Sequence, residues 1–165
     1  MNFQTQNTTT MATKENNIEI LNDLIRINND RVVGYTKATE ELKDEDNDLR
    51  VVFQSFILSS KRNISELTEL VLRNGGEPAH DSTAAGKIYH AWMDVKATFT
   101  GHDLLAILNA CEYGEDAAQR SYKIALEDSA EVSSDVAQLI TEQKATLKKE
   151  HDAVKEYRDS VKVTK

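Results

Sequence analysis

Apolar residues recur along the N-terminal half of the chain at intervals of three, four and seven, which places them on one face of an α-helix. The first such stretch runs from Glu15 to about Lys43, and its predicted buried positions are Ile18, Leu21, Ile25, Val32, Tyr35 and Leu42. The second follows an acidic run at 44–48, and its predicted buried positions are Leu49, Phe53, Phe56, Ile57, Ile64, Leu67 and Val71. Gly75, Gly76 and Pro78 then give a helix stop signal. The pattern therefore predicts two long helices joined by a short connection.

Two further amphipathic helices are predicted in the C-terminal half. One runs from about Leu104 to Glu127, with Leu104, Ile107, Leu108, Cys111, Ala118, Tyr122, Ala125 and Leu126 on its apolar face. The other follows a polar turn, with Val136, Leu139, Ile140, Leu147, Val154 and Val161 on its apolar face. No segment alternates with period two, and six glycines and one proline are too few for a fold of many short strands. The sequence therefore predicts an all-α protein.

The connections predict how the four helices are ordered. Ile88, Trp92, Val95 and Phe99 form a shorter helical pattern between the second and third long helices. It ends near Gly101, where Thr100 and Asp103 resemble a capping box, although one continuous helix through Gly101 is the alternative. Two short turns and one long helical crossover make the second and third long helices parallel. That connectivity is typical of a ferritin-like four-helix bundle with a helical crossover.

Length and composition limit the domain organisation and the partners. The 165 residues suit one domain, predicted over 15–162, and the Thr/Asn/Gln-rich residues 1–14 are predicted to be a disordered tail. The start lacks the pattern of a signal peptide, and no apolar run is long enough to cross a membrane, so we expect a cytoplasmic protein. The net charge of −8 argues against binding to nucleic acid or to an anionic membrane surface.

A few polar residues fall inside the predicted apolar faces. Asn28, Ser60, Glu115 and Gln143 lie at about the same depth, one on each long helix. We interpret them as a hydrogen-bonded polar core layer that fixes the register of the helices. If Glu115 is buried without a cation, its pKa would rise, and a neutral Glu115 could then donate to Gln143.

A metal site is the alternative use of these side chains. A ferritin-like di-iron site takes a Glu from each of two helices and a Glu-x-x-His pair from each of the other two. None of the four predicted helices contains that pair. An incomplete site for one divalent ion could use Glu112, Glu115, Glu150 and His151, with iron or manganese as the preferred metal and zinc as a further candidate.

The remaining candidates do not form a recognisable catalytic site. His80, His90 and His102 are scattered over a loop, the crossover and a helix start, so we interpret them as surface residues. Cys111 lies on an apolar helix face and is interpreted as an inert core thiol. We therefore predict no catalytic residue. A small apolar ligand inside the bundle is a third hypothesis, which would require a cavity.

Several short segments resemble an uncharacterised bacterial family of ferritin-like four-helix bundles, family 2383 of the domains of unknown function. The resemblance covers about residues 16–160. It is carried by Asn29-Asp30-Arg31, Gly34-Tyr35, Gly75-Gly76-Glu77-Pro78, His90-Ala91-Trp92 with Lys96, Ala110 to Asp116, and His151-Asp152. The resemblance implies the fold and a bacterial source, and it brings no established activity or cofactor. It suggests testing Glu112, Glu115, Asp116 and His151 as a group, although helical geometry places Asp116 outside the apolar arc.

These observations favour a non-catalytic ferritin-like bundle that works through protein–protein contacts. We expect a homodimer or a module for a protein partner, without a cofactor, and a stress-related role by analogy with ferritin-like proteins. The alternative function is a degenerate metal-binding bundle that uses Glu112, Glu115, Glu150 and His151.

Overall fold

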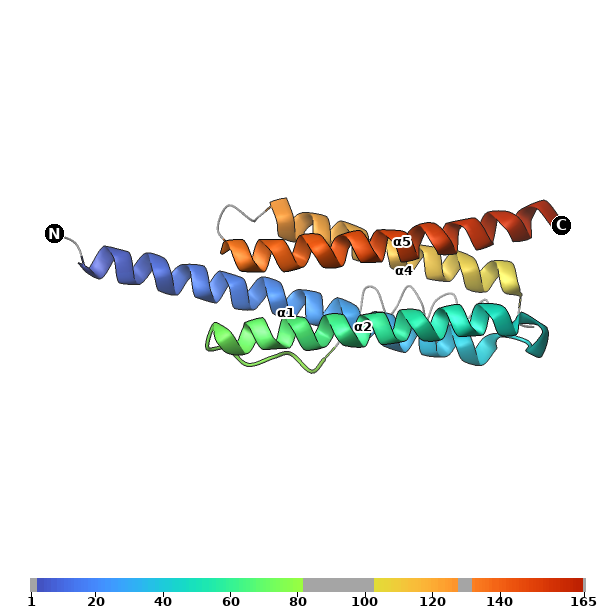
Figure 1. Ribbon diagram of the computed structural model, residues 1–165, viewed down its shortest axis with the longest axis horizontal. Helices are drawn as coiled ribbons and strands as arrows, with labels where there is room; N and C mark the ends of the chain where they lie inside the picture. Colours follow the sequence, from blue (N-terminus) through green and yellow to red (C-terminus); the bar gives the residue numbers. More distant parts are fainter. Residues whose placement is uncertain (1–2, 82–102, 128–131, 165) are drawn as a thin grey trace.

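The computed structural model describes residues 3–81, 103–127 and 132–164. In these residues the chain forms four long helices and one short 3-10 turn: α1 (Phe3–Glu41), η1 (Asp44–Asp46), α2 (Asn47–Arg73), α4 (Leu104–Glu127) and α5 (Ser134–Thr164). Figure 1 shows them packed side by side as an elongated bundle. The prediction of an all-α four-helix bundle is confirmed. The predicted crossover helix, with His90 and Trp92, lies outside the described residues, as does His102.

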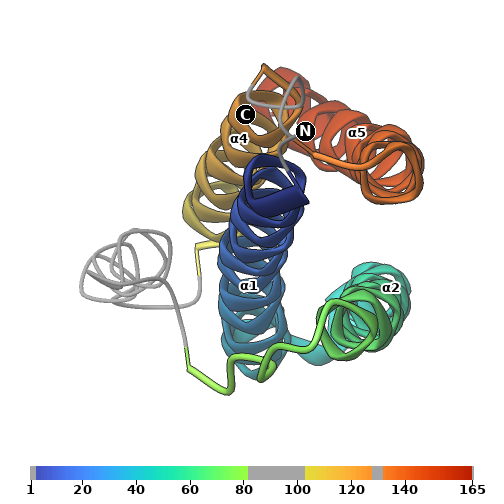
Figure 2. The same cartoon turned by 90° about the vertical axis from the view of Figure 1, so that its left-hand side faces the viewer.

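The direction of the helices agrees with the predicted connectivity. Because a short connection joins α1 to α2, these helices are antiparallel, and α4 and α5 form a second antiparallel pair (Figure 1). α2 and α4 run in the same direction, as expected for a bundle with one long crossover. Figure 2 shows α1 packed against both α2 and α4, with α5 beside α4. α2 and α5 approach one another less closely than these pairs do.

α1 is longer than the sequence predicted. It starts at Phe3, so most of the stretch predicted as a disordered tail at residues 1–14 is helical. The main free-energy cost of a helix is its nucleation, and each residue added to an existing helix forms one more hydrogen bond. The amphipathic stretch after Glu15 provides the nucleus, and the residues before it continue the same helix. Figure 1 shows these first turns projecting beyond the ends of the other helices.

The apolar faces of the four helices form one continuous core. Fully buried side chains come from every helix, and they include Leu21, Ile25, Phe53, Leu67, Leu108, Ile140 and Leu147. The ring of Tyr35 on α1 packs against Phe53 and Phe56 of α2, with ring centroids 5.2 Å and 5.3 Å apart. Each such side chain contributes about 1.5–3 kcal/mol when fully buried. The core is therefore sufficient to hold polar groups at fixed positions between the helices.

The end of α2 depends on the backbone conformation of Gly75. Gly75 has a φ of 82°, its N–H donates to the carbonyl of Leu72, and the N–H of Gly76 donates to Val71. This pair of bonds is the Schellman arrangement that ends many helices. We expect Gly75→Ala to lower the free energy of unfolding by about 1–2 kcal/mol, because a Cβ is unfavourable at positive φ. Urea denaturation would measure the change against Ser65→Ala on the exposed face of α2, and equal stability of the two variants would contradict this expectation.

Candidate functional site

The guanidinium of Arg31 lies at the centre of the bundle and is fully buried. Its Nη2 atom donates to Glu115 Oε1 of α4 and to Glu150 Oε2 of α5, both at 2.6 Å. Its Nη1 atom donates to Ser60 Oγ of α2, also at 2.6 Å. Because Arg31 itself belongs to α1, these bonds connect all four helices. We call Arg31, Tyr35, Ser60, Glu115 and Glu150 the Arg31 network.

Charge and burial oppose each other in the Arg31 network. Burial alone would lower the pKa of Arg31, but the carboxylates of Glu115 and Glu150 outweigh it, so the pKa is raised. Burial is the main cause of the raised pKa of Glu150, and Arg31 opposes that rise. The Tyr35 hydroxyl donates to Glu115 Oε1. Burial is the largest cause of the raised pKa of Tyr35, and the negative charge of Glu115 is the next largest. Tyr35 therefore remains a hydrogen-bond donor, and Arg31 remains a cation.

This arrangement differs from a neutral Glu115 that donates to Gln143. Glu115 instead accepts hydrogen bonds from Arg31 and Tyr35. The sequence contained a signal for Arg31, which follows Asn28 by three residues and precedes Tyr35 by four, on the same face of α1. Arginine is rarely buried unless it is paired. Its burial was missed because its two acidic partners lie on other helices.

A second buried network lies beside the first. Asn28 Nδ2 donates to the Tyr122 hydroxyl at 2.8 Å, and that hydroxyl donates to Gln143 Oε1 at 2.8 Å. Asn63 Nδ2 donates to Asn28 Oδ1 at 3.1 Å, and Gln143 Nε2 donates to the Asn63 carbonyl at 3.3 Å. Burial raises the pKa of Tyr122, so its hydroxyl keeps its proton. We call these four residues the Tyr122 network.

The structure divides the predicted polar core layer between these two networks. All four predicted residues are buried. Asn28 and Gln143 belong to the Tyr122 network, whereas Ser60 and Glu115 belong to the Arg31 network. The sequence missed Asn63, which lies three residues after Ser60 on α2 and is buried. The expected single layer is therefore two neighbouring layers, each with one or more residues from every helix.

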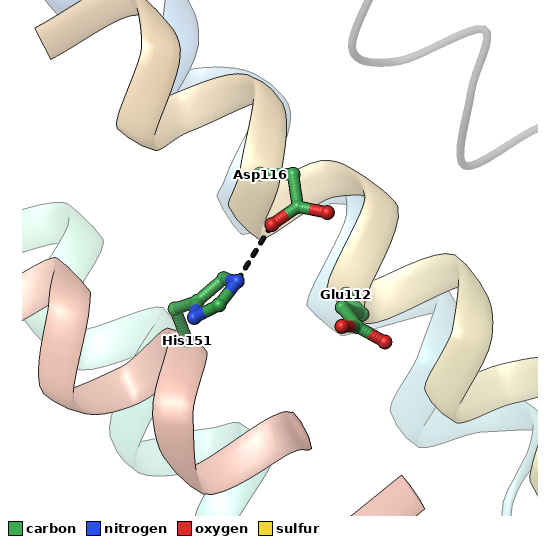
Figure 3. Close-up of side chains that lie close together, drawn as sticks. All are labelled: Glu112, Asp116 and His151. Carbon is green, nitrogen blue, oxygen red and sulfur yellow. Dashed lines mark hydrogen bonds and ion pairs between the residues drawn. The ribbon is translucent and has the colours of Figure 1, made fainter. Parts of the chain in front are cut away.

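A cluster of possible metal ligands lies between α4 and α5 (Figure 3). Glu112 and Asp116 are four residues apart on α4, and His151 faces them from α5. One ligand atom from each side chain lies within 4.8 Å of the other two, and all three residues are partly buried. The His151 Nε2 and Asp116 Oδ1 atoms are 2.6 Å apart. We call Glu112, Asp116 and His151 the His151 cluster.

Other charged groups already contact the side chains of the His151 cluster. Arg158 Nη1 donates to Glu112 Oε2 and its Nη2 donates to Asp159 Oδ1, the latter at 2.8 Å. His151 Nδ1 lies 3.0 Å from Asp152 Oδ1. Partial burial tends to lower the pKa of His151, but hydrogen bonds to Asp152 and Asp116 outweigh it and raise the pKa. A cation that binds here must therefore compete with a proton and with Arg158.

The four predicted metal ligands do not come together as one site. Glu112 and His151 lie in the His151 cluster, whereas Glu115 and Glu150 point inward onto Arg31. Asp116, which the sequence placed outside the apolar arc, belongs to the cluster because α5 packs beside α4 and brings His151 against that side of the helix.

The chain is similar to known proteins in sequence over residues 16–128 and in fold over most of its length. The family described as Domain of unknown function (DUF2383) matches residues 16–128. The chain belongs to this family. A solved structure titled as a mutant of Dps1 from Mycobacterium smegmatis has a TM-score of 0.74 at 11% sequence identity, over 88% of this chain and 97% of that chain. No curated protein sequence matches. At this identity the similarity shows the fold alone, a ferritin-like four-helix bundle.

The centre of this DUF2383 bundle does not fit a ferritin-like di-iron site. Such a site takes four carboxylates and two histidines. Among the described residues the centre offers the carboxylates of Glu115 and Glu150, and the guanidinium of Arg31 bonds to both. Outside the long helices the sequence has one Glu-x-x-His spacing, Glu77 to His80, and both of its side chains are exposed in the loop after α2. They lie too far out to supply the core.

Two other features of this DUF2383 protein bear on its function. Cys111 is fully buried, and burial raises the pKa of its thiol above the ordinary range, as expected for an inert core residue. Within the described ranges, no helix combines the length and the apolar character needed to cross a membrane.

Proposed function

We propose that this DUF2383 protein binds one divalent metal ion at the His151 cluster, on the α4–α5 side of the bundle. The observation that carries the proposal is the convergence of an imidazole and two carboxylates within 4.8 Å, from two different helices. Imidazole with carboxylate oxygens suits iron and manganese, and zinc accepts the same donors. The site differs from the one expected from the sequence by using Asp116 in place of Glu115 and Glu150.

The surroundings of the cluster indicate what must happen when the ion binds. His151 must give up a ring proton, because only the neutral imidazole has a lone pair for a metal. Glu112 must exchange Arg158 for the ion, which frees the guanidinium to pair with Asp159 alone. Asp152 can keep its contact with His151 Nδ1 while Nε2 binds the metal, as a carboxylate commonly does behind a ligating histidine.

Metal titration of the purified protein after chelation tests the proposal. We expect one equivalent of Mn²⁺ to bind at pH 7.5, as measured by calorimetry and by elemental analysis after gel filtration. His151→Ala and Asp116→Asn should each weaken binding by a factor of 10 or more, since each removes a ligand. Arg158→Gln should strengthen it, because the competing cation is gone.

Glu142→Gln provides a matched control for the titration. It removes an exposed carboxylate from α5, outside the His151 cluster, and should leave binding unchanged. Wild-type protein that retains no metal, or His151→Ala protein that binds Mn²⁺ as tightly as wild type, would refute the proposed site.

A contact function is the second candidate, and the outer face of α2 supports it. Val51, Leu58 and Leu72 are 59%, 67% and 60% exposed, and spacings of 7 and 14 residues place them on one side of the helix. Lys61, Arg62 and Glu69 lie beside them, so this stripe carries no excess of acidic side chains on a protein of net charge −8. Exposed apolar side chains on a face without excess negative charge favour contact with a second copy of the chain.

Light scattering during gel filtration tests the contact function. We expect a dimer that Leu58→Glu converts to a monomer, because the substitution places a charge in the apolar stripe. Ile124→Glu on α4 is the matched control, since Ile124 is 57% exposed and lies on another helix. A wild-type protein that is monomeric at all concentrations tested would contradict a dimer formed through α2.

A further inference from the structure

The Arg31 network arranges oxygen atoms around one point in the way a cation-binding site does. A single nitrogen, Arg31 Nη2, donates to carboxylate oxygens from α4 and α5, both at 2.6 Å. The neighbouring Nη1 is bonded to a hydroxyl oxygen from α2. The hydroxyl of Tyr35 bonds to the same Glu115 oxygen. Carboxylate and hydroxyl oxygens are hard donors of the kind that Mn²⁺, Fe²⁺ and Mg²⁺ accept.

The charges at this point are not balanced by Arg31. One guanidinium faces two carboxylates, those of Glu115 and Glu150. In addition, Glu115 Oε2 is buried and has no hydrogen-bond partner among the described residues. An unpartnered buried acceptor is costly, because it has lost its water without a replacement. A divalent ion would balance both carboxylates and could also bind the free oxygen.

We infer that Arg31 serves as the built-in cation of the bundle centre, and that removal of its side chain converts the centre into a divalent-metal site formed by Glu115, Glu150 and Ser60. This site is separate from the His151 cluster, and the inference does not depend on the proposed function. It explains how a ferritin-like bundle can hold converging carboxylates at its centre without a resident metal. The guanidinium of Arg31 provides the positive charge that a metal ion would otherwise provide.

The test uses Arg31→Ala in a His151→Ala background, so that binding at the His151 cluster cannot contribute. Mn²⁺ is added to the chelated protein, and bound metal is measured by electron paramagnetic resonance and by elemental analysis after gel filtration. We expect one equivalent of Mn²⁺ to bind to the double variant and to raise its Tm. His151→Ala protein with Arg31 intact should bind no Mn²⁺ at the centre and show no shift in Tm.

Two matched variants identify the ligands of the new site. Arg31→Lys with His151→Ala keeps a positive charge at the centre and should bind no Mn²⁺. Glu115→Gln added to Arg31→Ala and His151→Ala should lose the binding that Arg31→Ala created. A folded Arg31→Ala/His151→Ala protein that binds no Mn²⁺ would overturn the inference, and so would metal binding that persists after Glu115→Gln.

The folding of the double variant provides a second readout. If Arg31→Ala/His151→Ala is unfolded in the absence of metal, circular dichroism should show recovery of helix when Mn²⁺ is added. A protein that stays unfolded with Mn²⁺ would also overturn the inference. Metal binding at the His151 cluster is tested separately, by comparing wild-type protein with His151→Ala.

Discussion

Replacement of Arg31 by methionine is expected to lower the free energy of unfolding by about 3–5 kcal/mol, the usual cost of removing one partner of a buried ion pair. The substitution keeps much of the side-chain volume but leaves Glu115 and Glu150 facing each other in the core, where they are 0% and 8% exposed. Equilibrium urea denaturation at pH 7.5 would measure the loss. A loss below about 1 kcal/mol would show that the pair is not desolvated as its burial indicates.

A variant without any of the three charges separates electrostatics from packing. Arg31→Met combined with Glu115→Met and Glu150→Met should regain most of the lost stability, because apolar side chains of similar volume often replace a buried ion pair at little cost. Lowering the pH should also reduce the loss of stability caused by Arg31→Met, since protonated carboxyl groups are less costly to bury. If neither the additional substitutions nor the lower pH changes this loss of stability, the loss comes from packing rather than from charge.

Metal binding at the His151 cluster is expected to weaken by up to about 100-fold between pH 7.5 and pH 5.5, because one displaced proton costs a factor of about 10 per pH unit below the pKa of the histidine. The pKa of His151 is raised, since hydrogen bonds to Asp152 and Asp116 outweigh its partial burial. Competition with the proton therefore begins at a higher pH than for an isolated histidine. Calorimetric titration with Mn²⁺ at several pH values would measure how steeply the affinity for the metal falls with pH.

Asp152→Asn is the informative control for this pH dependence. It removes the carboxylate beside His151 Nδ1, so the pKa of His151 should fall and the loss of affinity should move to lower pH. The stability of the metal-free wild-type protein should change with pH in the opposite direction, increasing as the pH falls. A raised pKa in the folded state stabilises the fold below the unfolded pKa, and this stabilisation is lost as the pH rises through the folded pKa. A flat affinity profile would show that His151 is not a ligand.

The helices could be predicted from the sequence because each has an apolar face with a clear period. The prediction for α4, from Leu104 to Glu127, matches its observed bounds. The N-terminal turns of α1 could not be predicted in this way, since Thr, Asn and Gln form no apolar face and their helical state follows from the helix that they extend. The spacing of apolar residues therefore identified the helices that bury a face in the core, and it failed where a helix continues past the core.

The candidate sites were harder to predict because they depend on which helices are neighbours. Glu115 and Glu150 could be placed on inward faces, but only the packing of α1 shows that Arg31 reaches both of them. Asp116 was assigned to the outside of the arc, and the position of α5 made it a neighbour of His151. A helical wheel treats one helix at a time, and it cannot report a partner that another helix supplies.

The two buried networks have a consequence for how the molecule comes apart. Detaching α5 alone would withdraw Gln143 from the Tyr122 network and Glu150 from the Arg31 network, and would expose their partners unpaired. Detaching α1 would do the same through Asn28 and Arg31. A helix that slid by one turn would likewise lose its bonds in both networks. Partly unfolded forms and forms with a shifted helix thus both lose buried hydrogen bonds and are unstable. Unfolding therefore becomes a single cooperative step.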